Sequence, residues 1–332
     1  MSSPAQQPTF LALSGGVGGA KLSLGLSQVL AERLSIIVNT GDDFEHLGLY
    51  ISPDADTTLY TLAGIVNPQT GWGRRDETWS FMSALATLGG PTWFRLGDGD
   101  LAIHIDRTQR LKRGATLTEI CEHLGNTFSI ASRILPMTDA PVRTVLETSA
   151  GRLPFQEYFV REECRPLVQS IRFEGAEAAR PTPQILTALK SPTLEGIVIC
   201  PSNPWLSVDP ILAVAGLRAA LRNSPAPVIA VSPIVAGKAL KGPAAKIFSE
   251  LGLEPSSKSI ARHYAGLIDA LVIDAEDAAT AKEMGLPVLV TNTVMLTRED
   301  KLALARQCLA LSKRLARAPA RQANRRLRDN VA

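Results

Sequence analysis

The feature that most constrains the fold is a strand–turn–helix–strand unit at the start of the chain. An apolar run, 10–13, leads into Ser14-Gly-Gly-Val-Gly-Gly19, and apolar residues then recur at helical spacing over 22–30. A second apolar run, 36–38, ends at Asn39-Thr-Gly-Asp-Asp43. Strands that are apolar at every position are typical of a parallel sheet covered by helices on both faces. The sequence therefore predicts a βαβ unit and an α/β fold.

The same pattern returns after about residue 190. Apolar runs alternate there with helical segments, at 196–200, 228–232, 270–274 and 288–290. Residues 8–60 and 190–312 are therefore expected to form one Rossmann-like core, with a mostly parallel sheet and helices on both faces. Asp209 followed by Pro210 predicts a helix start, and Thr297 with Asp300 predicts a capping box for the last helix.

The region between these halves, 61–189, is expected to be an inserted cap. Residues 60–135 read as helical, and β-rich segments at 142–148 and 155–160 flank Ala150-Gly151 as a hairpin does. The last segment, 313–332, is a basic tail without interleaved aromatic residues. Such a tail is typical of a solvated helix end, so no function and no nucleic-acid partner is assigned to it.

Composition excludes several classes of protein. The 332 residues are 45% hydrophobic and 20% charged, with a net charge of +3, which excludes disorder, collagen and coiled coil. No apolar run approaches the roughly 18 residues of a membrane helix, and the polar start resembles no signal peptide, so a cytoplasmic protein is expected. The four cysteines form no Cys-x-x-Cys pair, which predicts reduced thiols and no zinc site.

The glycine turn places backbone N–H groups at the start of a helix, which suits a phosphate. It fits neither standard fingerprint, because Lys21 stands where a dinucleotide motif has its third glycine, and Leu22 stands where a Walker loop has Ser or Thr. Hydride transfer and kinase chemistry are therefore disfavoured. A purely structural tight turn is the alternative, and Lys21 favours anion binding over it.

Four acids follow the second strand: Asp42, Asp43, Asp54 and Asp56. Clustered carboxylates repel one another, and a cation between them removes that repulsion. The cluster predicts a Mg²⁺ site. The alternative is that Asp54 and Asp56 cap a helix over 57–65, which would account for only part of the cluster.

Further polar loops follow other predicted elements. Phe94-Arg-Leu-Gly-Asp-Gly-Asp-Leu101 carries Arg95, Asp98 and Asp100 on a turn, and Trp72 and Trp93 nearby fit either a planar aromatic ligand or the core. Two later loops follow buried strands, where ligands of parallel sheets bind. They contain Pro201-Ser-Asn-Pro204, and Ser232, Lys238, Lys241 and Gly242. Lys238 and Lys241 either bind phosphates or are ordinary surface lysines. The four histidines do not have the spacing of metal ligands.

Taken together, these motifs closely resemble the 2-phospho-L-lactate transferase family of coenzyme F420 biosynthesis over about residues 10–295. The resemblance implies transfer of a phosphorylated three-carbon acid from its guanylyl diphosphate anhydride to the ribityl hydroxyl of the deazaflavin Fo. The products would be F420-0 and GMP, with Mg²⁺ required and a homodimer as the assembly. The motifs that carry it are Ser14–Lys21, Asn39–Asp43, Ile51–Thr57, Gly71–Gly73, Leu96–Ala102, Leu135–Asp139, Pro201–Pro204 and Ser232–Ile234.

The resemblance also implies roles for individual residues. The acids Asp42, Asp43, Asp54 and Asp56 would hold the metal, with Asp43 and Asp56 catalytic and Asp56 orienting the Fo hydroxyl. Asp56, Arg95 and Asp98 would contact Fo. The nucleotide would be held by Gly15, Gly16, Gly18, Gly19, Lys21, Ser202, Asn203, Ser232, Lys238, Lys241 and Gly242.

Two questions stay open at the level of sequence. The phosphorylated acid is phospholactate, phosphoenolpyruvate or phosphoglycerate, and no motif separates these three. The alternative function is that of a non-catalytic regulator from a related, gluconeogenesis-factor-like family that binds nucleotide sugars.

Overall fold

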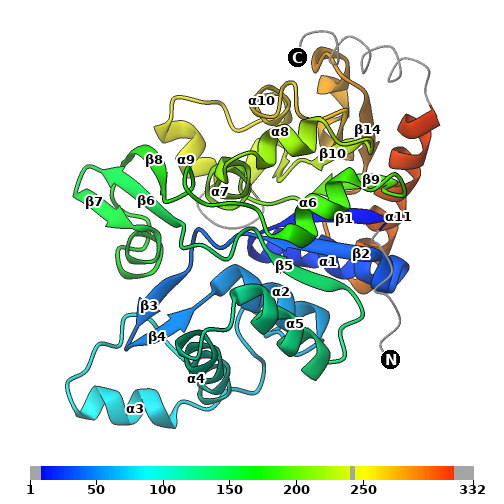
Figure 1. The fold of residues 1–332 in the computed structure, drawn as a ribbon. Helices are drawn as coiled ribbons and strands as arrows, with labels where there is room; N and C mark the ends of the chain where they lie inside the picture. Colours follow the sequence, from blue (N-terminus) through cyan, green and yellow to red (C-terminus); the bar gives the residue numbers. More distant parts are fainter. Residues whose placement is uncertain (1–8, 240–243, 318–332) are drawn as a thin grey trace, which may run out of the picture.

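A parallel seven-stranded sheet forms the centre of the computed structural model, which describes residues 9–239 and 244–317 (Figure 1). Its strand order is β14-β13-β10-β9-β1-β2-β5, and every neighbouring pair is parallel. This confirms the α/β prediction. The strands are β1 (Phe10–Ser14), β2 (Leu34–Val38), β5 (Arg133–Pro136), β9 (Gly196–Ile199), β10 (Val228–Val231), β13 (Ala270–Asp274) and β14 (Val288–Thr291).

Helices cover both faces of this sheet because its strands are apolar at successive positions. In β1, Leu11 and Leu13 point into one buried cluster and Phe10 and Ala12 into the other. The first cluster packs against α6 (Pro183–Lys190), α7 (Asp209–Ala213), α8 (Leu217–Arg222), α9 (Ala244–Glu250) and α10 (Ser257–His263). The second packs against α1 (Gly16–Leu30), α2 (Pro53–Leu62), α5 (Leu117–Thr127) and α11 (Arg298–Arg317).

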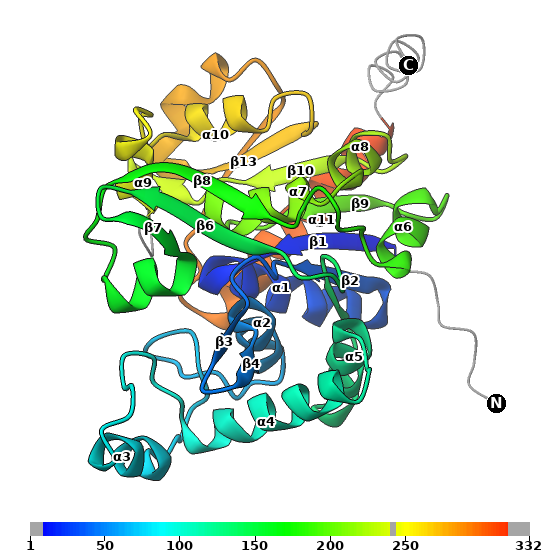
Figure 2. The ribbon, with the colours of Figure 1, turned by 60° about the vertical axis from the view of Figure 1, so that its left-hand side comes forward.

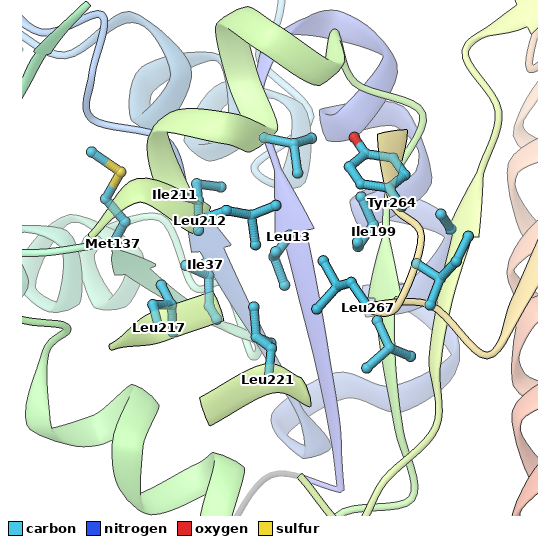
Figure 3. Close-up of a cluster of buried hydrophobic side chains, with 14 of the residues drawn as sticks. Leu13, Ile37, Met137, Ile199, Ile211, Leu212, Leu217, Leu221, Tyr264 and Leu267 are labelled. Carbon is cyan, nitrogen blue, oxygen red and sulfur yellow. The ribbon is translucent and has the colours of Figure 1, made fainter. Parts of the chain in front are cut away.

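Figure 3 shows part of the first cluster. Leu13, Ile37 and Ile199, from three neighbouring strands, lie under side chains of the covering helices. Those side chains include Ile211, Leu212, Leu217 and Leu221. Burial of this apolar area, at roughly 25 cal/mol per Å², fixes the sheet that carries the loops described below.

Smaller elements lie beyond the carboxyl ends of the sheet (Figure 2). They are the hairpin β3 (Phe44–His46) and β4 (Leu49–Ile51), the helices α3 (Ser80–Thr87) and α4 (Asp98–Lys112), and a three-stranded antiparallel sheet of β7 (Gly151–Pro154), β6 (Arg143–Thr148) and β8 (Val168–Glu174). A short hairpin joins β11 (Ile234–Val235) to β12 (Lys238–Ala239). Short helical turns are η1 (Ala31–Arg33), η2 (Glu157–Arg161), η3 (Pro204–Val208) and η4 (Ala275–Glu283).

Two features of the region 61–189 differ from the sequence-based expectation. The segment contributes β5 to the edge of the central sheet, because the short apolar run at Ile134 and Leu135 pairs with β2. The predicted hairpin exists, but its second strand is Gly151–Pro154, and 157–161 forms the helical turn η2. Phe155, at the start of that turn, packs into the buried core.

Both predicted helix starts are confirmed, and one of the two predicted caps is formed. Thr297 and Asp300 form reciprocal bonds at the start of α11: the Thr297 N–H donates to Oδ2 of Asp300 at 2.8 Å, and the Asp300 N–H donates to Oγ1 of Thr297 at 3.1 Å. Helix α7 begins at Asp209 with Pro210 in its first turn, as predicted, but Asp209 does not cap it, because η3 runs directly into α7. Its carboxylate instead contacts Nε2 of His263 at 2.9 Å.

All four cysteines are free in the structure. None of the helices in residues 9–239 and 244–317 is long and apolar enough to cross a membrane. The last turn of α11 extends into the basic segment 313–332, of which residues 318–332 lie outside the described structure.

Gly25, in the middle of α1, allows α11 to pack closely, since a Cβ there would overlap the carbonyl of Lys301. We expect Gly25→Ala to destabilise the protein by about 1–3 kcal/mol, because neither helix backbone can move without disturbing the core. Urea denaturation measures this change. Gly125→Ala in α5 is the matched control: nothing lies within 4 Å of the added carbon, so it should stabilise the helix by about 0.5–1 kcal/mol. Equal effects at both positions would contradict this account.

Candidate active site

A cavity of about 580 Å³ lies at the carboxyl ends of the central strands. The chain passes from β1 to β2 on one side of the sheet and later to β9 on the other, so β1 and β9 mark the point where the strand order reverses. Ligands of open parallel sheets bind at such a point. The cavity is lined by Gly15, Gly16, Gly18, Lys21, Asp42, Asp54, Asp56, Arg95, Ser202, Asn203 and Ser232. Loops far apart in the sequence thus meet as expected.

The other predicted residues lie elsewhere. Gly19 is buried behind the turn, where a Cβ would contact Oγ of Ser202 at 2.6 Å. Asp43 and Lys238 are not among the lining residues, and Lys238 is exposed on its hairpin. Asp98 binds the start of α3: its carboxylate accepts hydrogen bonds from the N–H groups of Ser80 and Phe81 and from the Thr78 hydroxyl. Lys241 and Gly242 lie outside the described residues.

The glycine turn has its shape for steric reasons. Gly16 has φ +62°, in the left-handed region that favours glycine, and a Cβ on Gly18 would overlap the carbonyl of Pro201. The Gly16 N–H donates to Oδ1 of Asp54 at 2.8 Å, and the Gly15 N–H donates to Oγ of Ser202 at 3.2 Å. Lys21 Nζ donates to the carbonyl of Met295 at 2.9 Å. An acidic side chain, Asp54, therefore occupies the positive end of the α1 dipole.

A buried amide holds Asp54 in that position. Asn39 Nδ2 donates to Oδ2 of Asp54 at 2.9 Å and to the carbonyl of Leu206 at 3.2 Å. Its Oδ1 accepts from the N–H of Gly41 at 2.8 Å. This one side chain therefore connects the loop after β2 with the starts of α2 and η3.

Asp42 and Asp54 form a pair of buried carboxylates at the cavity wall. Burial raises the pKa of both groups, and the charge of Asp54 raises the pKa of Asp42 further. Oδ1 of Asp42 is buried and makes no hydrogen bond in the described structure. Two adjacent carboxylates with an unpartnered oxygen fit a divalent cation that completes its coordination with water and phosphate oxygens.

The four predicted metal ligands do not converge on one point. Asp43 accepts hydrogen bonds from the hydroxyls of Ser52 at 2.8 Å and Tyr50 at 2.9 Å. Asp56 forms a buried bidentate ion pair with Arg107 of α4. Within the described ranges, no three acidic, histidine or cysteine side chains form a preassembled metal site. The capping alternative is also wrong, because no side chain caps α2 and Asp54 bonds to α1 instead.

Aromatic side chains form another part of the cavity lining. Trp93 and Phe94 stack edge-on with ring centroids 5.7 Å apart, and both also contact the β3–β4 hairpin through Phe44. These rings therefore belong both to a small core and to the cavity wall. Arg95 lies over the ring of Trp79 at 4.1 Å from its centroid. The aromatic lining consists of Tyr60, Trp72, Trp93, Phe94, Phe155 and Phe159.

A second set of polar residues lies beside Asp56; the sequence pointed to Asp100 only as part of a polar turn, gave His104 no role and did not single out Tyr60 or Arg107. His104 lines the cavity, its Nδ1 lies 3.2 Å from Nη1 of Arg107, and burial lowers its pKa to about 4. Tyr60 donates a short hydrogen bond to Asp100. Asp100, His104 and Arg107 are spaced by four and three residues, which places them on one face of a helix. That spacing is the signal that could have found them.

The fold and the cavity together define an α/β protein with a cavity where a parallel sheet reverses its strand order. The model of the family described as 2-phospho-L-lactate transferase CofD matches residues 10–298. The chain belongs to this family, and it is an enzyme of the 2-phospho-L-lactate transferase type.

Individual relatives agree with this assignment. The chain is 40% identical to a phosphoenolpyruvate transferase of Streptomyces griseus, over 91% of this chain and 98% of that protein. It is 39% identical to a 2-phospho-L-lactate transferase of Methanopyrus kandleri, over 91% and 97% of the two chains. A solved structure of a UPF0052 family protein from Bacillus halodurans superposes with a TM-score of 0.61 at 14% identity, covering 92% and 100%. That last similarity concerns the fold alone.

The buried ion pair generates a prediction about stability. Arg107→Met leaves Asp56 buried without a counter-charge, so we expect a loss of about 3–5 kcal/mol. Arg110→Met, one turn further along α4, breaks an exposed pair with Asp106 and should change stability by about 1 kcal/mol or less. Urea denaturation of both variants measures the difference. A loss no greater for Arg107→Met than for Arg110→Met would show that the buried pair contributes nothing.

A second prediction concerns pH. Burial raises the pKa of Asp43 to about 7, whereas an unfolded Asp titrates near about 3.9. Between these values the folded protein holds a proton that the unfolded chain releases, so this group makes stability fall as pH rises from about 4 to 7. In metal-free buffer, the melting temperature of Asp43→Asn minus that of the wild type should therefore increase as the pH is raised from 5 to 8. The control Asp106→Asn should run parallel to the wild type, and a parallel Asp43→Asn curve would refute the prediction.

Proposed function

We propose that this enzyme transfers a phosphorylated three-carbon acid from its guanylyl diphosphate anhydride to the ribityl hydroxyl of the deazaflavin Fo. The products of this reaction are F420-0 and GMP. The observation that carries the proposal is that one cavity is lined by two kinds of residue, first glycines and carboxylates and second aromatic rings. The first kind suits a metal-bound diphosphate, and the second suits a planar, tricyclic acceptor.

The proposed reaction takes place between the two substrates that these residues would bind. The acceptor hydroxyl attacks the phosphorus of the acid phosphate in line with the departing GMP. The first-turn N–H groups of Val17 and Gly18 and the ammonium of Lys21 bind phosphate oxygens and hold them in place. Stacking against Trp93 and Phe94 fixes the deazaflavin so that its ribityl chain points toward the phosphates.

Mg²⁺ is the cofactor of this proposal, with Asp42 and Asp54 as its protein ligands. A bound Mg²⁺ would neutralise the charge that accumulates on the phosphates. The same two carboxylates would otherwise repel an anionic donor, because they lie beside the glycine turn on which the phosphates are expected to bind. The proposed homodimer would carry one such cavity in each subunit.

The donor acid belongs to a class of small phosphorylated carboxylates. Relatives with nearly equal identity are named phosphoenolpyruvate transferase and 2-phospho-L-lactate transferase. We therefore propose one of these two acids as the donor group, with phosphoglycerate as the third compound to compare. The alternative of a non-catalytic regulator is disfavoured, because these relatives are transferases.

The decisive experiment incubates the pure protein with Fo, Mg²⁺ and each guanylylated acid in turn, and detects F420-0 species and GMP by mass spectrometry. One acid should give product at a rate well above the other two. Absence of product with all three would overturn the proposed function. Binding of a nucleotide sugar, with no binding of Fo at millimolar concentration, would favour the regulator instead.

The metal proposal makes a separate prediction. Activity should vanish in excess EDTA and return with Mg²⁺, and Asp42→Asn should lower kcat/KM by about a hundredfold or more. Asp106→Asn, on the outer face of α4, should keep wild-type activity. Full turnover in EDTA, or an Asp42→Asn variant as active as Asp106→Asn, would refute the assignment of the metal.

A further inference from the structure

The buried contacts of Asp56 bear on which group accepts a proton in the proposed transfer. Both carboxylate oxygens of Asp56 accept hydrogen bonds from Arg107, and Nδ1 of His104 lies 3.7 Å from Oδ2. Each oxygen of this carboxylate thus already accepts a hydrogen bond from the guanidinium, and the side chain is almost fully buried. Asp56 is therefore better placed to hold the wall of the cavity than to take a proton.

Asp100 lies close to this pair but, unlike Asp56, has one carboxylate oxygen that no side chain of the described residues engages. It lines the cavity from the first turn of α4, and its side chain keeps 17% of its surface exposed. Its Oδ1 accepts the hydrogen bond from Tyr60 of α2. Its Oδ2 has no hydrogen-bond partner among the residues that the structure describes, so one oxygen is available to a ligand.

The backbone around Asp100 holds the carboxylate in one orientation. The N–H groups of Gly99 and Asp100 donate to the carboxylate of Glu77 at 2.7 and 2.9 Å. Nη1 of Arg74 donates to the carbonyl of Gly99 at 3.0 Å. Nε2 of His104, one turn along the helix, lies 3.8 Å from Oδ1 of Asp100. A carboxylate fixed in this way can meet a hydroxyl without losing further side-chain entropy.

We propose that Oδ2 of Asp100 accepts the proton of the hydroxyl that attacks phosphorus, while Tyr60 acts as a positioning residue through Oδ1. This inference rests on the proposed function and adds the base to it. The hydroxyl oxygen forms the new bond to phosphorus, the bond from phosphorus to the GMP oxygen breaks, and GMP leaves with that electron pair. The proton ends on Asp100 and passes to solvent through the open side of the cavity once the product has left.

The charge environment of Asp100 agrees with this role. The titratable and charged groups that face it are Tyr60 and Asp56 from α2, His104 and Arg107 from α4, and Glu77 from the segment before α3. Burial, and then the charge of Asp56, raise the pKa of Asp100 to about 7, while the hydrogen bond from Tyr60 lowers it. A base with a pKa near the working pH is the most effective one.

The experiment measures kcat and KM for Fo between pH 5.5 and 9 in the wild type, Asp100→Asn, Tyr60→Phe and the control Asp106→Asn. In the wild type kcat should fall below about pH 7, where Asp100 is protonated. Asp100→Asn should lose about a hundredfold in kcat and this acidic limb together, with KM for Fo nearly unchanged. Tyr60→Phe should move the limb to higher pH, because the carboxylate loses a hydrogen bond that favours its charged form.

The outcomes separate the two proposals. If the wild type makes no product, the proposed function is overturned and this inference falls with it. If the wild type is active and Asp100→Asn keeps kcat within threefold with the same pH profile, only the inference is overturned. A rise in KM alone would make Asp100 a binding residue and would also overturn it. Binding of Fo to Asp100→Asn, followed by fluorescence, confirms that this variant is folded.

Discussion

The site depends on one set of hydrogen bonds, those that hold the carboxylate of Asp54. Its two oxygens join the first turn of α1 through Gly16 and the loop after β2 through Asn39. Asn39 in turn reaches the carbonyl of Leu206 after β9. Three loops that leave three different strands are therefore fixed relative to one another by two buried side chains. Because buried polar groups must find partners, any rearrangement of these loops leaves at least one of them unsatisfied.

A second buried interaction joins α4 to α2, the helix that carries Asp54. Arg107 of α4 pairs with Asp56 of α2, and both side chains are almost fully buried. An ion pair of this kind adds little stability to the folded protein. Loss of one partner is nevertheless strongly destabilising, because it leaves an uncompensated buried charge. The helix that carries Asp100 and His104 is thereby held against the helix that carries Tyr60. The lining residues of α4 therefore keep a fixed position relative to those of α2, as a transfer between two bound substrates requires.

The same region concentrates groups that destabilise the free protein. Burial raises the pKa of Asp42, Asp43, Asp54 and Asp100. These groups cost free energy in the folded state at neutral pH and are expected at a functional site. The hydrophobic clusters on both faces of the sheet, one of which Figure 3 shows in part, supply stability that offsets this cost.

The sequence by itself determined the class of fold and the place of the site, because uniformly apolar strands allow only a covered parallel sheet and its carboxyl ends converge. It also placed Gly16, Gly18, Lys21, Asp54 and Ser202 at one cavity. Only the tertiary structure decided which acid does what. Asp43, Asp56 and Asp98 are the same residue type in the sequence. In the structure, two hydroxyls bind Asp43, a guanidinium binds Asp56 and the start of α3 binds Asp98. Those partners are distant in the chain or set by the packing of α3 and α4, and local patterns carry no information about them.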